Sequence, residues 1–253
     1  MCTVSWLHTE GGYHLLCNRD ELSTRKPALA PRLQKLKGTR VIAPEDGDHG
    51  GSWIAVNEFG LALCLLNRYD DSPDKPTISY TSRGLLLTEL IDSPSIAIAR
   101  DRIRQTDLSG FRPFTILVLE PGSPALIAHW TGQERSIIEN GESEMPLISS
   151  SFDTRGVTAF RKELFKRLSS RARTSPLARS GCADEDLLRA FHKSHAPVPS
   201  AYSPCMHRTD ARTVSLSWIK VAHRKIEFLY CPDAPCSGVM MEPVEFERAQ
   251  RLS

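Results

Sequence analysis

The stretch MCTVSWLHTEGGYHLLCNRDEL (1–22) decides the fold. Its two β-rich runs, TVSWLHT and YHLLCNR, are joined by Glu10-Gly11-Gly12, a pattern typical of a β-hairpin. Because paired strands keep a fixed register about their turn, residue 2 should lie opposite residue 19 or 20. The hairpin therefore predicts that Cys2 lies beside Arg19 and Asp20 at the open end of two strands.

Further strands follow this hairpin. SWIAV and LALCLLN surround the turn NEFG (57–60), and TVSLSWIKV and KIEFLYC surround AHR (222–224). Short strands are also predicted for FTILVLE, ALIAHWT, RSIIEN and PLISSSF. RDELSTRKPALAPRL (19–33), by contrast, is Pro-rich and charged, which is typical of a loop.

Helical spacing of apolar residues occurs in SRGLLLTELID, PSIAIARDRIRQ, TRGVTAFRKELFKRL and DEDLLRAFHKS. The tight turns make neighbouring strands antiparallel, and the helices fall in blocks between groups of strands. This order predicts an α+β fold, a four-layer αββα sandwich of two mostly antiparallel sheets flanked by helices. No repeat and no long linker divides the chain, so residues 1–253 are expected to form a single domain.

Composition excludes several classes of function. The 253 residues carry a net charge of +2, which gives no general reason to bind nucleic acid. No apolar run approaches the roughly 20 residues of a membrane span, and the N-terminus lacks the pattern of a signal peptide. An odd number of cysteines, seven, without an export signal indicates reduced thiols and a cytoplasmic protein.

The segment CPDAPC (231–236) is the one local pattern that suggests a metal. Its two cysteines are four residues apart, and no second cysteine or histidine pair is evident to complete a zinc site. We therefore expect a turn with two buried thiols, no metal site and no other cofactor.

Cys2 is either an ordinary core thiol or a nucleophile. Initiator methionine is usually removed before a small residue, and removal would give Cys2 a thiol and a free α-amino group together. An α-amine with a reference pKa of about 7.7–8.0 is partly neutral at cellular pH and can accept the thiol proton during attack on a carbonyl. The site would also need polar neighbours that hold the amine and donors that stabilise the oxyanion.

The MC start, NRDE (18–21), GGSW (50–53) and LLN (65–67) together resemble the NRDE family, also called the transport and Golgi organisation 2 family. CMHRTDARTVSLSWI (205–219) is similar to that family as well. The family in turn resembles the N-terminal nucleophile hydrolases, especially bile salt hydrolases and penicillin V acylases. The resemblance implies the αββα sandwich and a nucleophilic Cys2.

The same resemblance implies roles for residues on the second strand. In the relatives, an arginine and an aspartate on this strand hold the cysteine and its amine. An ungapped alignment puts Asn18 and Glu21 at those two positions. Arg19 and Asp20 are one residue away, and a one-residue slip turns a side chain to the other face of a strand. A bulge would bring Arg19 and Asp20 to the cysteine; without one, Asn18 and Glu21 would face it.

Other positions are implied to complete the site. Asn67 stands at the place of the oxyanion asparagine, and the alternative is a structural role in which its side chain brackets the end of the strand. Ser150 or Ser151 stands in the stretch of a second asparagine, and a serine hydroxyl can donate one hydrogen bond there. The late arginine of the relatives corresponds to Arg212, or less favourably to Arg208.

Two segments are candidates for substrate binding. Gly51, Ser52 and Trp53 form either a simple turn before a strand or a backbone lip that lies close to the substrate. His207 and Arg208 lie in a polar loop, which is either a solvated turn or a rim for an anionic substrate group.

The leading interpretation is an amidohydrolase that cleaves a linear amide, a C–N bond other than a peptide, in a small acyl substrate. The alternative is a non-catalytic binding or carrier protein of the same fold that handles haem, lipid or acyl-CoA, functions associated with the eukaryotic branch of the family. Cleavage of a thioester by the same cysteine is a third interpretation. The hydrolase resemblance also implies a homo-oligomer, a dimer or a tetramer.

Overall fold

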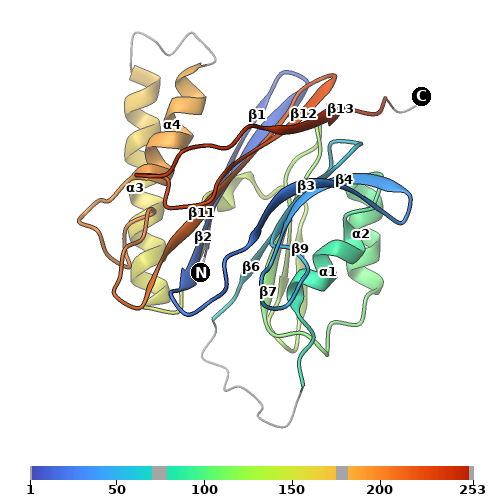
Figure 1. Cartoon of the computed structure of the whole chain (residues 1–253), viewed down its shortest axis with the longest axis horizontal. Helices are drawn as coiled ribbons and strands as arrows, with labels where there is room; N and C mark the ends of the chain where they lie inside the picture. The colour runs from blue at the N-terminus through green and yellow to red at the C-terminus, as the bar shows by residue number, and fades with distance from the viewer. Residues whose placement is uncertain (1, 70–78, 175–181, 251–253) are drawn as a thin grey trace.

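Two antiparallel sheets pack face to face in the computed structural model, which describes residues 2–69, 79–174 and 182–250 (Figure 1). Helices α1 (Arg83–Leu90) and α2 (Ile96–Gln105) cover the outer face of one sheet, and α3 (Thr154–Thr174) and α4 (Cys182–Lys193) cover the other. The predicted αββα sandwich is confirmed. No helix in the described ranges is both long and apolar enough to cross a membrane.

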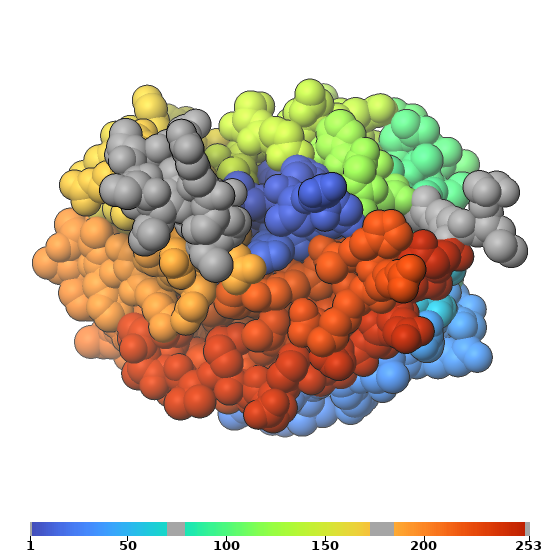
Figure 2. Space-filling model, turned by 90° about the horizontal axis from the view of Figure 1, so that it is seen from above, coloured from blue at the N-terminus to red at the C-terminus, as the bar shows by residue number. Residues whose placement is uncertain are grey.

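The first sheet has the order β10-β1-β2-β11-β12-β13 in the described part of the chain. Its strands are β1 (Cys2–Thr9), β2 (Gly12–Leu22), β10 (Leu147–Ser149), β11 (Ala211–Val221), β12 (Lys225–Cys231) and β13 (Val244–Glu247). Because β2 pairs with β1 on one side and β11 on the other, segments from both ends of the chain lie side by side. Figure 2 shows this contact between the blue N-terminal and orange-red C-terminal segments.

The second sheet runs from β3 to β9 in sequence order across the described residues. Its strands are β3 (Leu29–Leu36), β4 (Thr39–Glu45), β5 (Ile54–Asn57), β6 (Ala62–Asn67), β7 (Phe114–Leu119), β8 (Leu126–Trp130) and β9 (Arg135–Ile138). The predicted hairpin at residues 52–67 is confirmed as β5 and β6.

The loop predicted at residues 19–33 is wrong at both ends, because β2 continues to Leu22 and β3 begins at Leu29. β3 is an edge strand, and Leu29 and Leu33 are about half exposed, at 51% and 49%. An edge strand tolerates Pro31 and charged side chains because one side of its backbone needs no partner strand. Its sequence therefore lacks the apolar alternation of a buried strand.

The N-terminal hairpin is buried on both faces. In β1, Val4 and Trp6 point between the two sheets, whereas Thr3 and Ser5 face α3 and α4, and all four are fully buried. Burying a side chain such as Val4 contributes about 1.5–3 kcal/mol. The polar residues on the helix side are buried with hydrogen-bond partners, which fixes the register that places Cys2.

The helices begin and pack where apolar spacing predicts. Leu86, Leu87 and Leu90 of α1 are buried against the second sheet. α2 begins after Ser95, whose hydroxyl accepts a hydrogen bond from the N–H of Ile98 at 3.2 Å. Such a cap satisfies a backbone donor that the first turn leaves unpaired. Both helices therefore hold the sheet whose strand β6 ends at the cavity described next.

Candidate active site

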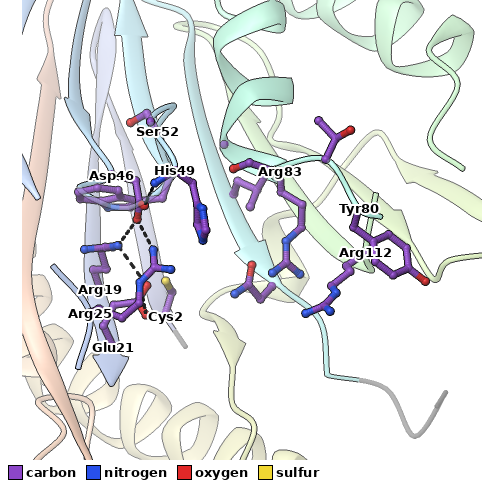
Figure 3. A pocket seen from close by; sticks show the side chains of 17 residues that line it. Cys2, Arg19, Glu21, Arg25, Asp46, His49, Ser52, Tyr80, Arg83 and Arg112 are labelled. Atoms are coloured by element: carbon purple, nitrogen blue, oxygen red, sulfur yellow. Dashed lines mark hydrogen bonds and ion pairs between the residues drawn. The ribbon is translucent and has the colours of Figure 1, made fainter. Parts of the chain in front are cut away.

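A cavity of about 400 Å³ opens at the end of the sandwich where β1 begins and β2 and β6 end (Figure 3). That volume suits a small molecule. Its lining comes from β1, β2 and β6, from the β2–β3 and β4–β5 connections, from the start of α1 and the residues just before it, and from Arg112 before β7. The cavity thus gathers segments that are far apart in the sequence.

Cys2 lies at the wall of this cavity and is 8% exposed. It is the first residue of β1 and is directly opposite Arg19 on β2 and Ser149 on β10. The register predicted from the hairpin is therefore confirmed. A hydrogen bond with the Cys17 thiol, together with burial, raises the pKa of the Cys2 thiol well above its usual value. The thiol is protonated at neutral pH, so nucleophilic attack needs a base.

Arg19 is held in place by acidic groups and an aromatic ring. Its guanidinium lies 2.5 Å from Asp46 Oδ2 and 3.2 Å from Glu21, and it stacks over the ring of Trp53 at 4.3 Å from the centroid. Arg25 also reaches Asp46 Oδ2 at 2.5 Å, as the dashed lines of Figure 3 show. Both arginines at this wall of the cavity thus have acidic partners.

Asp46 links this cluster to the loop between β4 and β5. Its Oδ1 accepts hydrogen bonds from the N–H groups of Asp48 and His49, at 3.1 and 3.0 Å. Burial alone would raise the pKa of Asp46, but the His49 N–H and the guanidinium groups of Arg19 and Arg25 hold that pKa below its usual value. Asp46 is therefore a carboxylate at neutral pH that fixes both the loop and the arginines.

The NRDE residues alternate between two sides of the sheet. Arg19 and Glu21 line the cavity. Asn18 and Asp20 face the helices: Asn18 donates to the carbonyls of His192 and Pro204, both at 2.9 Å. The register shift between β2 and β11 lies on β11, between Thr213 and Ser215, and the pairing of β1 with β2 is continuous.

This alternation corrects the sequence-based placement of Asn18 and Asp20 beside Cys2. Asp20 is fully buried, accepts a hydrogen bond from the Thr213 hydroxyl at 2.6 Å and lies 3.6 Å from the Arg161 guanidinium. Neither residue lines the cavity. With no bulge in β2, the odd-numbered residues face Cys2, so the pair at the cavity is Arg19 and Glu21.

Asn67 lines the cavity at the end of β6. Its carbonyl accepts a hydrogen bond from Ser149 Oγ at 2.5 Å, and its side-chain Nδ2 donates to Tyr69 at 3.3 Å. Ser150 does not line this cavity, and its hydroxyl donates to the carbonyl of Phe152 at 2.6 Å. The serine directly opposite Cys2 is thus Ser149, one residue before the predicted one.

The GGSW segment approaches the site through Gly50, Ser52 and Trp53, which line the cavity. Gly51 does not line it; a Cβ there would lie 2.6 Å from the backbone of Gly84, and φ is +70°. Glycine is needed at this position because the two loops touch backbone to backbone. Gly51 therefore fixes the lip without forming part of the cavity wall.

The predicted rim of His207 and Arg208 lies outside the cavity lining, as does Arg212. Arg208 pairs with Asp210 at 2.7 Å. Arg212 is opposite Glu21 in the strand register, but its side chain is 53% exposed and pairs with Asp233 at 3.2 Å. The polar loop that carries these residues folds over the helix side of the sheet.

Sequence reasoning missed the cationic wall across the cavity from Cys2, formed by Arg83 and Arg112 with Tyr80 (Figure 3). Arg83 donates to the carbonyl of Pro113 at 2.9 Å, and no carboxylate lies within 4.0 Å of it among the described residues. Burial, and then the charge of Arg112, lower the pKa of Arg83. Arg112 lies over the ring of Tyr80, 5.2 Å from its centroid.

The fold is that of the N-terminal nucleophile hydrolases. The C2A mutant of the conjugated bile acid hydrolase from Clostridium perfringens superposes with a TM-score of 0.58 at 10% identity, covering 100% of this chain and 99% of that one. Penicillin V acylase from Agrobacterium tumefaciens superposes with a TM-score of 0.56 at 10% identity, covering 90% of this chain and 82% of that one. The Caenorhabditis elegans ortholog of N-acylethanolamine-hydrolyzing acid amidase superposes with a TM-score of 0.57 at 12% identity, covering 87% of this chain and 92% of that one.

Sequence comparison gives the family. A sequence model of transport and Golgi organisation 2 matches residues 1–209, and the chain belongs to this family. No curated protein matches the sequence significantly.

Proposed function

We propose that this protein hydrolyses a linear amide of a small acyl compound, with Cys2 as the nucleophile. The observation that carries the proposal is the position of Cys2: its side chain lines a cavity of small-molecule size and lies directly opposite Arg19. The similar solved structures are, by their names, a conjugated bile acid hydrolase, a penicillin V acylase and an acid amidase. The protein is accordingly proposed to be an enzyme.

The proposed reaction needs Cys2 to be the first residue of the mature chain; residue 1 lies outside the described residues. The α-amine of Cys2 takes the proton of the thiol as sulfur attacks the carbonyl carbon. The tetrahedral intermediate collapses when the C–N bond breaks, and the α-ammonium gives its proton to the leaving amine. Water then attacks the thioester, with the α-amine again as base, and releases the acid and the free thiol.

The raised pKa of the Cys2 thiol supports a base-assisted attack, since little thiolate exists before the substrate binds. Asn67, which lines the same cavity, is the proposed oxyanion donor. Arg19 is proposed to orient the thiol and the amine, because Asp46, Glu21 and the Trp53 ring hold its guanidinium across from Cys2.

The cavity charge favours a substrate with an anionic group. Arg19 and Arg25 already have acidic partners, whereas Arg83 has no carboxylate within 4.0 Å in the described ranges. A partly buried guanidinium without a counter-ion gains most from a bound carboxylate or similar anion. We propose that this end of the substrate lies at Arg83 while the amide carbonyl lies at Cys2.

The anion subsite can be tested apart from the chemistry. Arg83→Gln should raise KM for a carboxylate-bearing acyl amide roughly tenfold or more, the effect of losing one charge-assisted hydrogen bond. KM for a neutral amide of the same acyl group should not change. Equal effects on both substrates would remove the subsite while leaving the nucleophile proposal standing.

A non-catalytic ligand carrier is the second candidate. It is favoured by the orientation of Asn18 and Asp20, which are buried on the helix side and so cannot assist Cys2 directly. In that function the same cavity would hold an anionic ligand such as haem or an acyl-CoA, with Arg83 as its anchor.

One experiment separates the two candidates. The intact mass of the reduced protein is measured before and after treatment with a thiol-directed acylating probe. The enzyme proposal expects loss of one methionine and a label on Cys2 that Cys2→Ser abolishes, counted apart from any label on the exposed Cys236. The matched control is Cys231→Ser, a buried thiol of β12 outside the cavity, which should label like the wild type. Retained methionine, or labelling unaffected by Cys2→Ser, would overturn the enzyme proposal and leave the carrier.

A further inference from the structure

Four side chains with metal-binding atoms meet on the helix side of the first sheet, away from the cavity. They are His195, Cys205 and His207, from the connection between α4 and β11, and Cys236, from the connection between β12 and β13. One ligand atom from each lies within 4.8 Å of all the others. Two segments about 30 residues apart in the sequence thus converge on one point.

Two of the distances among these atoms have the length of an edge of a zinc tetrahedron. His207 Nε2 lies 3.5 Å from Cys205 Sγ and 3.4 Å from Cys236 Sγ. Zinc bonds of about 2.3 Å to sulfur and about 2.0–2.1 Å to nitrogen, at tetrahedral angles, put sulfur and nitrogen roughly 3.5 Å apart. The two observed separations therefore equal those around a shared zinc ion.

The fourth member completes the set. The ring of His195 lies edge-to-face against that of His207, with centroids 5.0 Å apart. Its Nε2 is buried and has no hydrogen-bond partner among the described residues. A buried ring nitrogen without a partner is costly unless it binds something that the protein atoms do not supply.

The backbone holds these ligands in position. The Cys205 N–H donates to the carbonyl of Ser194 at 3.0 Å, which ties the segment to the end of α4. Met206 lies between two of the ligands. Its N–H donates to the Thr213 hydroxyl on β11 at 2.8 Å, and its carbonyl accepts a hydrogen bond from the Thr213 N–H at 2.9 Å. Backbone hydrogen bonds of the fold therefore hold the segment that carries Cys205 and His207.

We infer that His195, Cys205, His207 and Cys236 bind one zinc ion. Two thiolates balance the charge of Zn²⁺, and two cysteines with two histidines are a ligand set that zinc prefers. All four ligands come from the protein, which leaves no open position, so the site is structural. The sequence-based expectation for CPDAPC is corrected: Cys231 is buried, but Cys236 is exposed and finds its partners at residues 195–207.

The zinc site is linked through Thr213 to β2, the strand that carries NRDE. Thr213, which holds the ligand segment at Met206, also donates a hydrogen bond to Asp20 at 2.6 Å. Binding the metal joins the α4–β11 and β12–β13 connections, which flank this point. The inference is independent of the proposed amidase reaction, because none of the four zinc-binding residues lines the cavity.

The test is the zinc content of the untagged full chain, purified in reducing buffer with added Zn²⁺ and then freed of excess metal. We expect one zinc per chain in the wild type, and a tetrahedral thiolate spectrum when Co²⁺ replaces it. Cys236→Ser should weaken Zn²⁺ binding more than roughly 100-fold, beyond the 10–100-fold cost of losing an outer-shell partner. Cys236 is exposed, so this variant should still fold.

Each ligand variant has a matched control. Cys231→Ser, five residues earlier in the same segment, is the control for Cys236→Ser, and His223→Ala, at an exposed histidine, is the control for His195→Ala. Both controls should keep the metal. A chelator should lower the Tm of the wild type but not that of Cys236→Ser, because a metal that binds only the folded chain stabilises it. Three results would overturn the inference: no zinc in the wild type, equal zinc in Cys236→Ser, or a mass two hydrogens lower that reveals a Cys205–Cys236 disulfide.

Discussion

On strand β2, Arg19 and Glu21 face the cavity, whereas Asn18 and Asp20, their immediate neighbours, face α3 and α4. The cavity side carries charges around a space that a ligand can enter. The helix side carries fully buried polar groups: the Asn18 amide donates two hydrogen bonds, and Asp20 interacts with Thr213 and Arg161. One tetrapeptide thus places alternate residues at the cavity, where the proposed chemistry occurs, and the others in the packing between sheet and helices, so variants of the two faces should fail in different ways.

The largest effect is expected on the helix face. Arg161 is 1% exposed, donates to the Thr3 hydroxyl and to carbonyls of residues 201–203, and pairs with Asp20. Arg161→Met should lower the free energy of unfolding by about 3–5 kcal/mol, because it leaves a buried carboxylate without its counter-ion. Chemical denaturation measures this, with the half-exposed neighbour Lys162→Met as the control. Equal stabilities of the two variants would contradict the helix-face role.

On the cavity face, Arg19→Met should lower kcat roughly 100-fold, the size of effect that a misplaced reacting group produces. Its free energy of unfolding should fall less than that of Arg161→Met. Arg25→Met is the matched control: it shares Asp46 but is not opposite Cys2, so its loss of kcat should be smaller. Turnover of a cleaved acyl amide measures both, and the opposite ranking of the two variants would refute the orienting role of Arg19.

A pH effect should separate the two faces further. His192 is fully buried on the helix side and bonds to Ser5 at 2.8 Å; burial, and then Arg161, lower its pKa from 6.5 to about 3. Between these values the unfolded chain binds a proton that the folded chain does not, so stability present above pH 6.5 is lost as pH falls toward 3. His192→Asn should flatten the unfolding free energy between pH 7 and 5. The control His223→Asn, which is exposed, should keep the wild-type slope.

The smallest effect is expected outside both faces. Arg208 forms a partly exposed ion pair with Asp210. Arg208→Ala should change the free energy of unfolding by no more than about 1 kcal/mol and should leave KM unchanged. Measured beside Arg83→Gln, it tests whether the anionic group of the substrate is recognised in the cavity or at the loop. A raised KM in Arg208→Ala would favour the loop.

Much of the fold could be predicted because it depends on local patterns. The turn at Gly11 and Gly12 sets the register that puts Cys2 opposite Arg19. The pattern could not decide which neighbours share that face with Arg19, because a single bulge would reverse the answer. The shift occurs instead on the partner strand β11, and no local signal in β2 reports it.

The rest of the site depends on residues brought together by tertiary packing. Asp46 lies in an acidic loop just before GGSW, a signal that could have suggested a partner for Arg19. Arg83 is the first residue of α1 and Arg112 comes just before β7, and nothing in their local sequence distinguishes them from surface residues. The metal ligands escaped prediction for the same reason, since the partners of Cys236 lie about 30 or more residues earlier.

The start of β1 has a practical consequence for recombinant production. Cys2 enters the sheet between Ser149 and Arg19, with neighbouring strands on both sides. Any purification tag fused before it would block the α-amine on which the proposed reaction depends and would direct extra chain at the cavity. β13 lies at the opposite edge of the same sheet, far from Cys2 in the strand order. Affinity tags should therefore be placed after β13, and the N-terminus should be left untagged so that a methionine aminopeptidase can remove Met1.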